Sequence, residues 1–325
     1  MFIPILLFAL GLVLLIKGGD WFVDGATGIA RRFKLPDIIV GATVVSIGTT
    51  LPEVMVSASG ALNGQGSMAY GNAIGSIICN TALIAAISLT FNPGPINTKT
   101  MRVPVIFFFT SAAIYCVATY FFGGFPRWIG ILLLAVFLVY LLLTVRQGLK
   151  NPETTIKEVE EDELKKQQKK MWIDLLLLVI GAALIALGAD LLVDNGTIIA
   201  EKLGVPETVI ALTFVALGTS LPELVTTITS LRKGHASLGI GNVIGANVFN
   251  LVLVSGISVT LAPFDVPAGN IIFGINSSLI IDIPLMLTVM ALLTLPALIK
   301  KKLSRWQGIV LLLIYCSFCI LQFAF

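Results

Sequence analysis

The sequence predicts an all-α membrane protein with ten transmembrane helices, arranged as two inverted repeats of five helices. Hydrophobic residues make up 57% of the 325 residues and charged residues only 12%. A globular core could not hide so much apolar surface, so lipid must be the solvent. The sequence also contains an internal repeat. At an offset of 170 residues and without a gap, residues 11–90 match residues 181–260 at 28 of 80 positions. The small net charge of +3 gives no indication of nucleic acid binding.

The spans are expected where about 20 apolar residues follow one another. The chain begins without a basic stretch and a small-residue cleavage site, so its first apolar run is interpreted as a retained span and not a signal peptide. The run of Glu and Lys at 148–171 predicts a solvated linker, either a plain spacer or a surface for cations or lipid, between repeats at 1–147 and 172–325. The spans are predicted at 3–22, 36–60, 67–92, 102–123, 127–147, 172–193, 206–231, 237–262, 270–299 and 305–325.

Basic residues predict the orientation. With the N-terminus outside, the inner loops hold eighteen Lys and Arg residues, and the outer loops hold two, Arg127 and Lys202. Cytoplasmic loops carry the excess of Lys and Arg, so we expect a multi-pass protein of the cell membrane with both termini outside and the 148–171 linker in the cytoplasm. Five spans is an odd number, so the second repeat lies upside down. Inverted repeats let one central site open alternately to either side.

The repeats agree best at two carboxylates. Gly48 to Glu53 reads Gly-Thr-Thr-Leu-Pro-Glu, and Gly218 to Glu223 reads Gly-Thr-Ser-Leu-Pro-Glu. The proline is expected to interrupt the helix and free backbone carbonyls, which are good cation ligands. Each glutamate also stands four residues after a threonine, Thr49 or Thr219, so the carboxylate and the hydroxyl are expected on one helix face. A membrane-embedded carboxylate costs about 2.5 kcal/mol or more to insert and indicates a functional site. The alternative is a structural acid hydrogen-bonded across helices.

A second layer of oxygens is expected from spans three and eight. Ser76 and Asn80 stand at i and i+4, and their repeat mates are Ala246 and Asn250. All-oxygen coordination suits Ca²⁺, whereas softer metals need imidazole or thiolate. The only histidine, His235, falls in a loop, and the cysteines fall in apolar stretches, so no zinc site, disulfide framework or cofactor is expected. The predicted oxygen ligands around the two glutamates are Ser46, Thr49, Thr50, Ser76, Asn80, Thr219, Ser220 and Asn250.

Charge counting indicates how such a site could work. Two carboxylates neutralise one Ca²⁺ or two Na⁺, so these ions should compete for overlapping oxygens, as exchange requires. Proton coupling stays open, because a glutamate in a low dielectric binds protons more readily.

Other polar and small residues have more ordinary interpretations. The glycines of Gly71–Gly75 and Gly241–Gly245 are spaced i and i+4, which predicts tight helix packing in lipid. Asn72 and Asn242 are expected to form interhelical hydrogen bonds. Four aspartates are expected near the ends of spans one and six, at caps or interfaces, with a role along an ion path as the alternative: Asp20, Asp24, Asp190 and Asp194.

These paired motifs, within 41–80 and 211–250, resemble the two alpha repeats of the sodium/calcium exchangers of the cation/Ca²⁺ exchanger superfamily, most closely the short prokaryotic and archaeal members. The resemblance covers nearly the whole chain. It implies a ten-helix fold that exchanges Na⁺ for Ca²⁺ by alternating access, with ions between spans two, three, seven and eight, and spans one and six sliding against them. Residue by residue, it implies ion ligands at Ser46, Thr49, Thr50, Glu53, Ser76, Asn80, Ala216 through its carbonyl, Thr219, Ser220, Glu223 and Asn250.

Two positions depart from the archaeal pattern. Asn250 stands where that pattern has aspartate, and Ala246 where it has serine. One charge and one hydroxyl are therefore absent from the second repeat. The resemblance implies a stoichiometry of three Na⁺ for one Ca²⁺, but with only two acids a third Na⁺ would leave the site with excess positive charge. The family's K⁺-independent branch carries asparagine near position 250, so K⁺ independence is favoured.

Three alternatives differ in class. A Ca²⁺/H⁺ antiporter would use the same fold and glutamates. A cation channel is disfavoured by the inverted repeat, and an intramembrane hydrolase would need a nucleophile with a base, or a strongly bound metal, which one loop histidine does not provide. The protein is therefore not expected to be an enzyme. The oligomeric state stays open, and a monomer would suffice for a central site.

Overall fold

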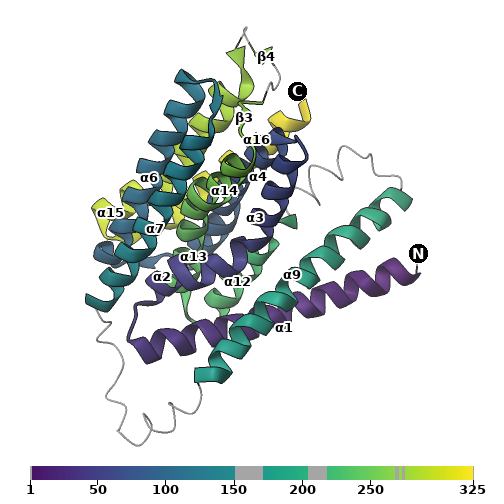
Figure 1. The fold of residues 1–325 in the computed structure, drawn as a ribbon. Helices are drawn as coiled ribbons and strands as arrows, with labels where there is room; N and C mark the ends of the chain where they lie inside the picture. Colours follow the sequence, from purple (N-terminus) through teal and green to yellow (C-terminus); the bar gives the residue numbers. More distant parts are fainter. Residues whose placement is uncertain (1, 151–170, 204–217, 268–270, 273–274, 325) are drawn as a thin grey trace, which may run out of the picture. The chain divides into compact units, whose positions relative to one another are not determined.

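The computed structural model describes residues 2–150, 171–203, 218–267, 271–272 and 275–324, and these residues are mostly helical (Figure 1). Eight of the described helical runs are long and apolar enough to cross a membrane. They are Phe2–Phe33, Asp37–Leu62, Gly66–Phe91, Thr98–Phe121, Arg127–Lys150, Met171–Ile199, Ala236–Leu261 and Ser278–Lys300.

The chain forms two compact units, each with segments from both halves of the sequence. The first unit is Met1–Thr49 with Val145–Asn242, and the second unit is Thr50–Thr144 with Val243–Phe325. The α-helices are α1 (Phe2–Phe33), α2 (Asp37–Val40), α3 (Ser46–Leu62), α4 (Gly66–Cys79), α5 (Ala86–Phe91), α6 (Thr98–Phe121), α7 (Arg127–Lys150), α9 (Met171–Lys202), α12 (Leu221–Arg232), α13 (Ala236–Phe249), α14 (Ser255–Leu261), α15 (Ile283–Lys300) and α16 (Arg305–Ala324). The π-helical turns are η1 (Gly41–Val45), η2 (Asn80–Ala85), η4 (Asn250–Val254) and η5 (Ser278–Asp282), and the short strands are β1 (Gly94–Pro95), β2 (Gly124–Phe125), β3 (Phe264–Asp265), β4 (Ile271–Ile272), β5 (Ile275–Asn276) and β6 (Lys302–Leu303).

Two of the predicted spans end too early. Helix α1 continues to Phe33, not residue 22, and α9 continues to Lys202, not residue 193. Apolar run length misses these extensions, because the added turns alternate charged residues with buried ones such as Val23 and Ala26. The predicted 270–299 span begins too early, because Ile271–Ile272 and Ile275–Asn276 form the strands β4 and β5 and the helical run begins at Ser278. The other predicted spans coincide with helices, except that residues 204–217 of the predicted 206–231 span and residues 151–170 of the linker lie outside the described residues.

In the first unit, α1 and α9 run side by side along much of their length (Figure 1). Glycines spaced by seven residues allow this close approach. A Cβ added at Gly11 would lie 2.9 Å from the carbonyl oxygen of Gly188, and one added at Gly18 would lie 2.9 Å from that of Gly181. Helices in lipid pack most closely where such small residues face each other. The side chains of Leu15, Phe22, Ile185 and Ala189 are buried in the same core.

An ion pair joins the ends of these two helices. The Arg32 Nε lies 2.6 Å from the Asp174 Oδ2, and both side chains are largely buried. Arg32 lies in the last turn of α1, and Asp174 in the first turn of α9. Each charge therefore also has a favourable interaction with its own helix dipole.

In the second unit, two antiparallel strand pairs join the connections between helices. β1 pairs with β6, with Gly94 opposite Leu303, and β2 pairs with β3, with Phe125 opposite Phe264. β1 precedes α6 and β2 follows it, so the two pairs lie at opposite ends of this helix. Aromatic rings pack around β2: the Phe125 ring centroid lies 4.5 Å from that of the buried Tyr115.

Candidate ion-binding site

The predicted ligands divide between the two compact units. Those in the first unit are Ser46, Thr49, Thr219, Ser220 and Glu223, and those in the second unit are Thr50, Glu53, Ser76, Asn80 and Asn250. Ala216 lies outside the described residues.

Glu53 lies in the middle of α3 and is buried. The preceding proline, Pro52, does not interrupt this helix, contrary to the prediction from the Leu-Pro pair. The irregular backbone lies earlier, in the π-helical turn η1, which ends directly before Ser46. One missing amide is tolerated within a helix when surrounding groups satisfy the freed carbonyl. The predicted relation between Thr49 and Glu53, one helical turn apart on one face, is confirmed.

Asn72 ties α4 to the helix that carries Glu53. Its Nδ2 donates to the main-chain oxygen of Glu53, at 3.2 Å, and to the Ser57 Oγ, at 2.8 Å. The predicted interhelical hydrogen bond of Asn72 is thus confirmed. The amide fixes the backbone at the carboxylate itself and holds α3 against α4.

Asn242 accepts hydrogen bonds from α3 in the first unit. The Ser46 Oγ shares its proton between the main-chain oxygens of Gly41, at 2.8 Å, and Asn242, at 3.0 Å, and the Asn242 Oδ1 accepts a hydrogen bond from the Thr49 Oγ1 at 3.2 Å. This prediction is confirmed as well. A hydroxyl that donates its proton still has lone pairs. Asn242 therefore orients the Ser46 and Thr49 oxygens with acceptor capacity left for a cation.

Asn80 and Asn250, the two predicted amide ligands, each open a π-helical turn. Both are fully buried, and neither side-chain amide has a hydrogen-bond partner among the described residues. Single π-turns within α-helices often mark functional sites. At Asn250, the Ser255 Oγ donates to the main-chain oxygen at 2.9 Å and satisfies a carbonyl at the widened turn. The sequence showed the paired asparagines but not the turns, because no local residue pattern specifies a π-turn.

The second repeat presents its glutamate differently. α12 begins at Leu221, with Pro222 and the buried Glu223 in its first turn, and Ser220 is the N-cap residue. Thr219 precedes the helix, so the predicted helical-face relation between Thr219 and Glu223 is wrong. A proline fits the first turn, where its missing amide costs nothing. A carboxylate there lies at the positive end of the helix dipole.

Ser76 is buried in α4, one turn before Asn80, and its repeat mate Ala246 is also buried. The structure thus keeps the predicted i and i+4 arrangement of Ser76 and Asn80. At the corresponding place in α13, Ala246 offers no side-chain oxygen.

The motif glycines pack as predicted only in part. A Cβ added at Gly48 would lie 2.9 Å from the Phe22 ring, and one at Gly241 would contact the main-chain oxygen of Ile38, so both allow close helix approach. At Gly71 and Gly75 no described residue lies within 4 Å of an added Cβ, so the packing prediction is not tested there.

The aspartates of spans one and six are not near helix ends, contrary to the prediction. Asp20 and Asp24 lie within α1, and Asp190 and Asp194 lie within α9, because both helices continue for several further turns. Asp20 and Asp24 contact Lys233, at the end of α12. The histidine, His235, follows in the loop as predicted, with its Nδ1 2.7 Å from the Asp37 Oδ2.

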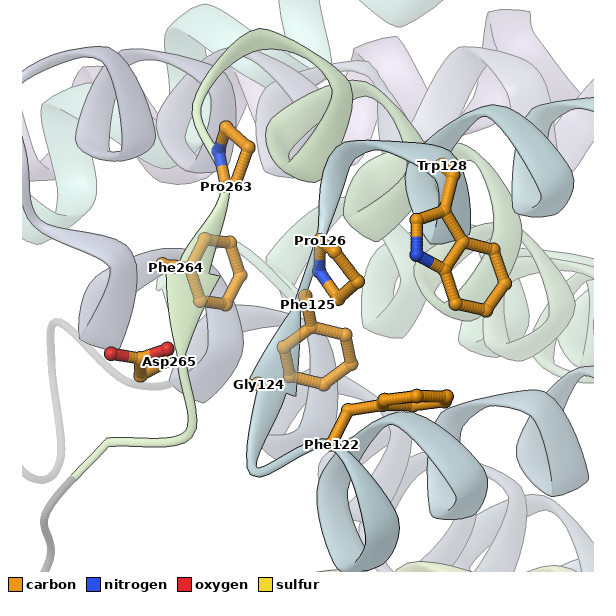
Figure 2. Close-up of a pocket in the computed structure, with 8 residues that line it drawn as sticks. All are labelled: Phe122, Gly124, Phe125, Pro126, Trp128, Pro263, Phe264 and Asp265. Atoms are coloured by element: carbon orange, nitrogen blue, oxygen red, sulfur yellow. The ribbon is translucent and has the colours of Figure 1, made fainter.

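A surface pocket of about 450 Å³ lies elsewhere, in the second unit (Figure 2). Figure 2 shows the rings of Phe122, Phe125, Trp128 and Phe264 around it, with Asp265 at the edge. None of the predicted ligands that the structure describes lines this pocket. A wall of aromatic rings with one carboxylate does not provide the oxygen set that a hard cation requires.

Comparison with known proteins decides the family. The sequence profile described as "Sodium/calcium exchanger protein" matches residues 3–146 and 173–324. The chain belongs to the sodium/calcium exchanger family. It is 35% identical to an uncharacterized membrane protein of Methanocaldococcus jannaschii, over 95% of this chain and 94% of that protein.

Exchangers of known name and structure are similar over the full length. The sodium/calcium exchanger MaX1 of Methanosarcina acetivorans is 29% identical and covers 98% of both chains. A structure of the sodium-calcium exchanger NCX_Mj superposes with a TM-score of 0.79 at 32% identity, over 97% of each chain. This exchanger-family chain is therefore an all-helical membrane protein, and a transporter, not an enzyme.

Proposed function

We propose that this chain is a secondary active antiporter that exchanges Na⁺ for Ca²⁺ by alternating access at one central site. Membership of the exchanger family over nearly its whole length carries the proposal. The buried Glu53 and Glu223, at repeat-related positions, agree with it, because a buried membrane carboxylate is retained where it binds ions.

The proposed ion ligands are the two carboxylates and the oxygens around them. Asn242 and Asn72 position the oxygens of Ser46 and Thr49 and the backbone of Glu53, and the π-turns present Asn80 and Asn250. Ser76, Thr50, Thr219, Ser220 and the carbonyl of Ala216 complete the proposed set. The transported ions, Na⁺ and Ca²⁺, are substrates, and K⁺ and a cofactor are not part of the proposed cycle.

The proposed architecture is two inverted five-helix repeats, 1–147 and 172–325, joined by the linker 148–171. The glycine contacts between α1 and α9 support it. Gly11 contacts Gly188, and the repeat mates of these two residues, Gly181 and Gly18, also contact each other. A pair of helices with this property is related to itself by a two-fold axis.

The strand pairs support the inversion independently. Gly94 and Pro95 of β1 have Phe264 and Asp265 of β3 as repeat mates at the same offset of 170. β1 lies before α6 and β3 pairs with β2 after α6, so repeat-related segments lie at opposite ends of one spanning helix. The same architecture implies a cell-membrane protein with both termini outside and the linker in the cytoplasm.

Uptake of ⁴⁵Ca²⁺ into proteoliposomes tests the function. We expect uptake into vesicles preloaded with Na⁺ and none into vesicles preloaded with K⁺ or choline. Uptake driven by a pH gradient without Na⁺ would instead support the Ca²⁺/H⁺ antiporter, which would use the same buried glutamates. Flux that needs no counter-ion and does not saturate would indicate a channel.

A further inference from the structure

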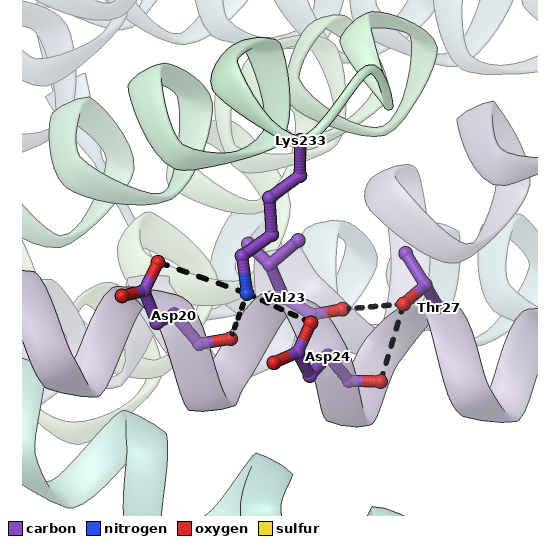
Figure 3. Close-up of polar contacts among 5 residues, drawn as sticks. All are labelled: Asp20, Val23, Asp24, Thr27 and Lys233. Carbon is purple, nitrogen blue, oxygen red and sulfur yellow. Dashed lines mark hydrogen bonds and ion pairs between the residues drawn. The ribbon is translucent and has the colours of Figure 1, made fainter.

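Lys233 connects α12 to α1 through two carboxylates (Figure 3). Its Nζ lies 2.7 Å from the Asp24 Oδ1, 3.7 Å from the Asp20 Oδ1 and 2.8 Å from the Asp20 main-chain oxygen. Asp20 and Asp24 are one turn apart on α1, so both face the lysine. We call Lys233, Asp20 and Asp24 the lysine clamp.

The clamp lies next to a close approach of α1 and α12. A Cβ added at Gly19, next to Asp20, would lie 2.7 Å from the Val225 Cγ1 and 2.9 Å from the Thr229 Oγ1. Thr229 is one turn before Lys233 on α12. The ion pairs therefore hold a tight helix crossing, and a movement that carries Lys233 away from Asp20 and Asp24 must break them.

The sequence repeat copies the carboxylates of the clamp but not its lysine. At the offset of 170 residues, Asp190 and Asp194 on α9 correspond to Asp20 and Asp24. The mate of Lys233 is Asn63, an exposed, uncharged residue directly after α3. Among the described residues, neither Asp190 nor Asp194 forms an ion pair. The lysine is thus present in the second repeat only, and its ion pairs join α12 of that repeat to α1 of the first.

We propose that Lys233 is a positioning residue that biases the exchanger toward one of its two access states. The proposal rests on the proposed inverted-repeat antiporter. In such a protein the repeats exchange roles between the two states, so a contact of α1 with α12 in one state corresponds to a contact of α9 with α3 in the other. The clamp stabilises the first state, and its uncharged counterpart does not stabilise the second.

The expected bias is modest. The Lys233 side chain is 27% exposed, and those of Asp20 and Asp24 are 37% and 54% exposed, so solvent screens the attraction. Partly exposed ion pairs of this kind shift an equilibrium about two- to fivefold. The apparent affinity of a ligand is proportional to the fraction of molecules in the state that binds it. A shift between the two access states therefore lowers the half-saturating Ca²⁺ concentration at one membrane face and raises it at the other.

The test uses right-side-out and inverted membrane vesicles, in which half-saturating Ca²⁺ is measured at each face. Lys233→Gln is expected to change the ratio of the two values about two- to fivefold. Asn63→Lys, which supplies the absent cation to the other repeat while leaving the native clamp intact, is expected to change it in the opposite direction. Combining Lys233→Asp with Asp24→Lys should restore the wild-type ratio.

A folding defect lowers the number of active molecules and leaves the ratio unchanged, so the ratio separates positioning from stability. The clamp would be refuted if both single variants left the ratio unchanged or moved it in the same direction. Na⁺-dependent exchange by the wild-type protein in the same vesicles tests the proposed function separately.

Discussion

Glu53 and Glu223 occupy the same place in the repeat but different places in their helices. Glu53 lies in the middle of α3, where Asn72 holds its main-chain oxygen. Glu223 lies in the first turn of α12. The backbone that carries each carboxylate is therefore placed differently: Asn72 of a neighbouring helix binds the main-chain oxygen of Glu53, whereas Glu223 lies at a helix N-terminus. Sequence identity between the repeats does not reveal this difference.

Replacing either glutamate with glutamine tests the proposed ligands. Each change keeps the size of the side chain and removes one of the two charges that neutralise Ca²⁺. We expect Na⁺-dependent ⁴⁵Ca²⁺ uptake to fall by about 30-fold or more in Glu53→Gln and in Glu223→Gln, while both proteins stay folded. Asp265→Asn, in the aromatic pocket, is the control and should keep full exchange. Retained uptake in both glutamine variants would reject the assigned site.

Asn250 tests the number of charges in the site. It is fully buried at the start of η4, and its side-chain amide has no hydrogen-bond partner among the described residues. Asn250→Asp adds a third carboxylate, so we expect half-saturating Ca²⁺ to fall by about tenfold, since Ca²⁺ affinity rises with ligand charge. Asn92→Asp, exposed after α5, adds the same charge away from the proposed ligands and should leave the affinity unchanged. An unchanged affinity in Asn250→Asp would mean that this side chain faces away from the ions.

At the scale of elements, long apolar runs predicted the helices well, and the motifs predicted the interhelical bonds of Asn72 and Asn242. The errors have physical causes. Helices α1 and α9 extend past their apolar runs because helix contacts bury Val23 and Ala26 between charged residues. Pro52 was expected to interrupt its span, but the irregular turn precedes it, at η1. Such turns depend on tertiary packing, which a single sequence does not show.

Two helix glycines make a test of helix packing. A Cβ at Gly241 would contact the main-chain oxygen of Ile38, whereas the nearest atom to one at Gly60 is the Met68 Sδ, at 3.0 Å. Gly241→Ala should therefore lower the free energy of unfolding by about 1–3 kcal/mol, because a backbone atom cannot move aside cheaply. Gly60→Ala should change it by about 1 kcal/mol or less, because the flexible Met68 side chain can move aside and alanine favours the helix. Thermal melting in detergent measures both, and equal destabilisation would contradict this packing.

At the scale of the whole molecule, the inverted repeat predicts that equivalent residues face opposite sides of the membrane. Leu62 ends α3 and Arg232 ends α12, they are 170 residues apart, and both are exposed. In a background without the four native cysteines, a membrane-impermeant thiol reagent applied to whole cells should label Leu62→Cys. It should label Arg232→Cys only after permeabilisation, because the loop after α12 is predicted to be cytoplasmic. Labelling of both from the same side would mean that the repeats are parallel, and a parallel pair could not exchange roles between two access states.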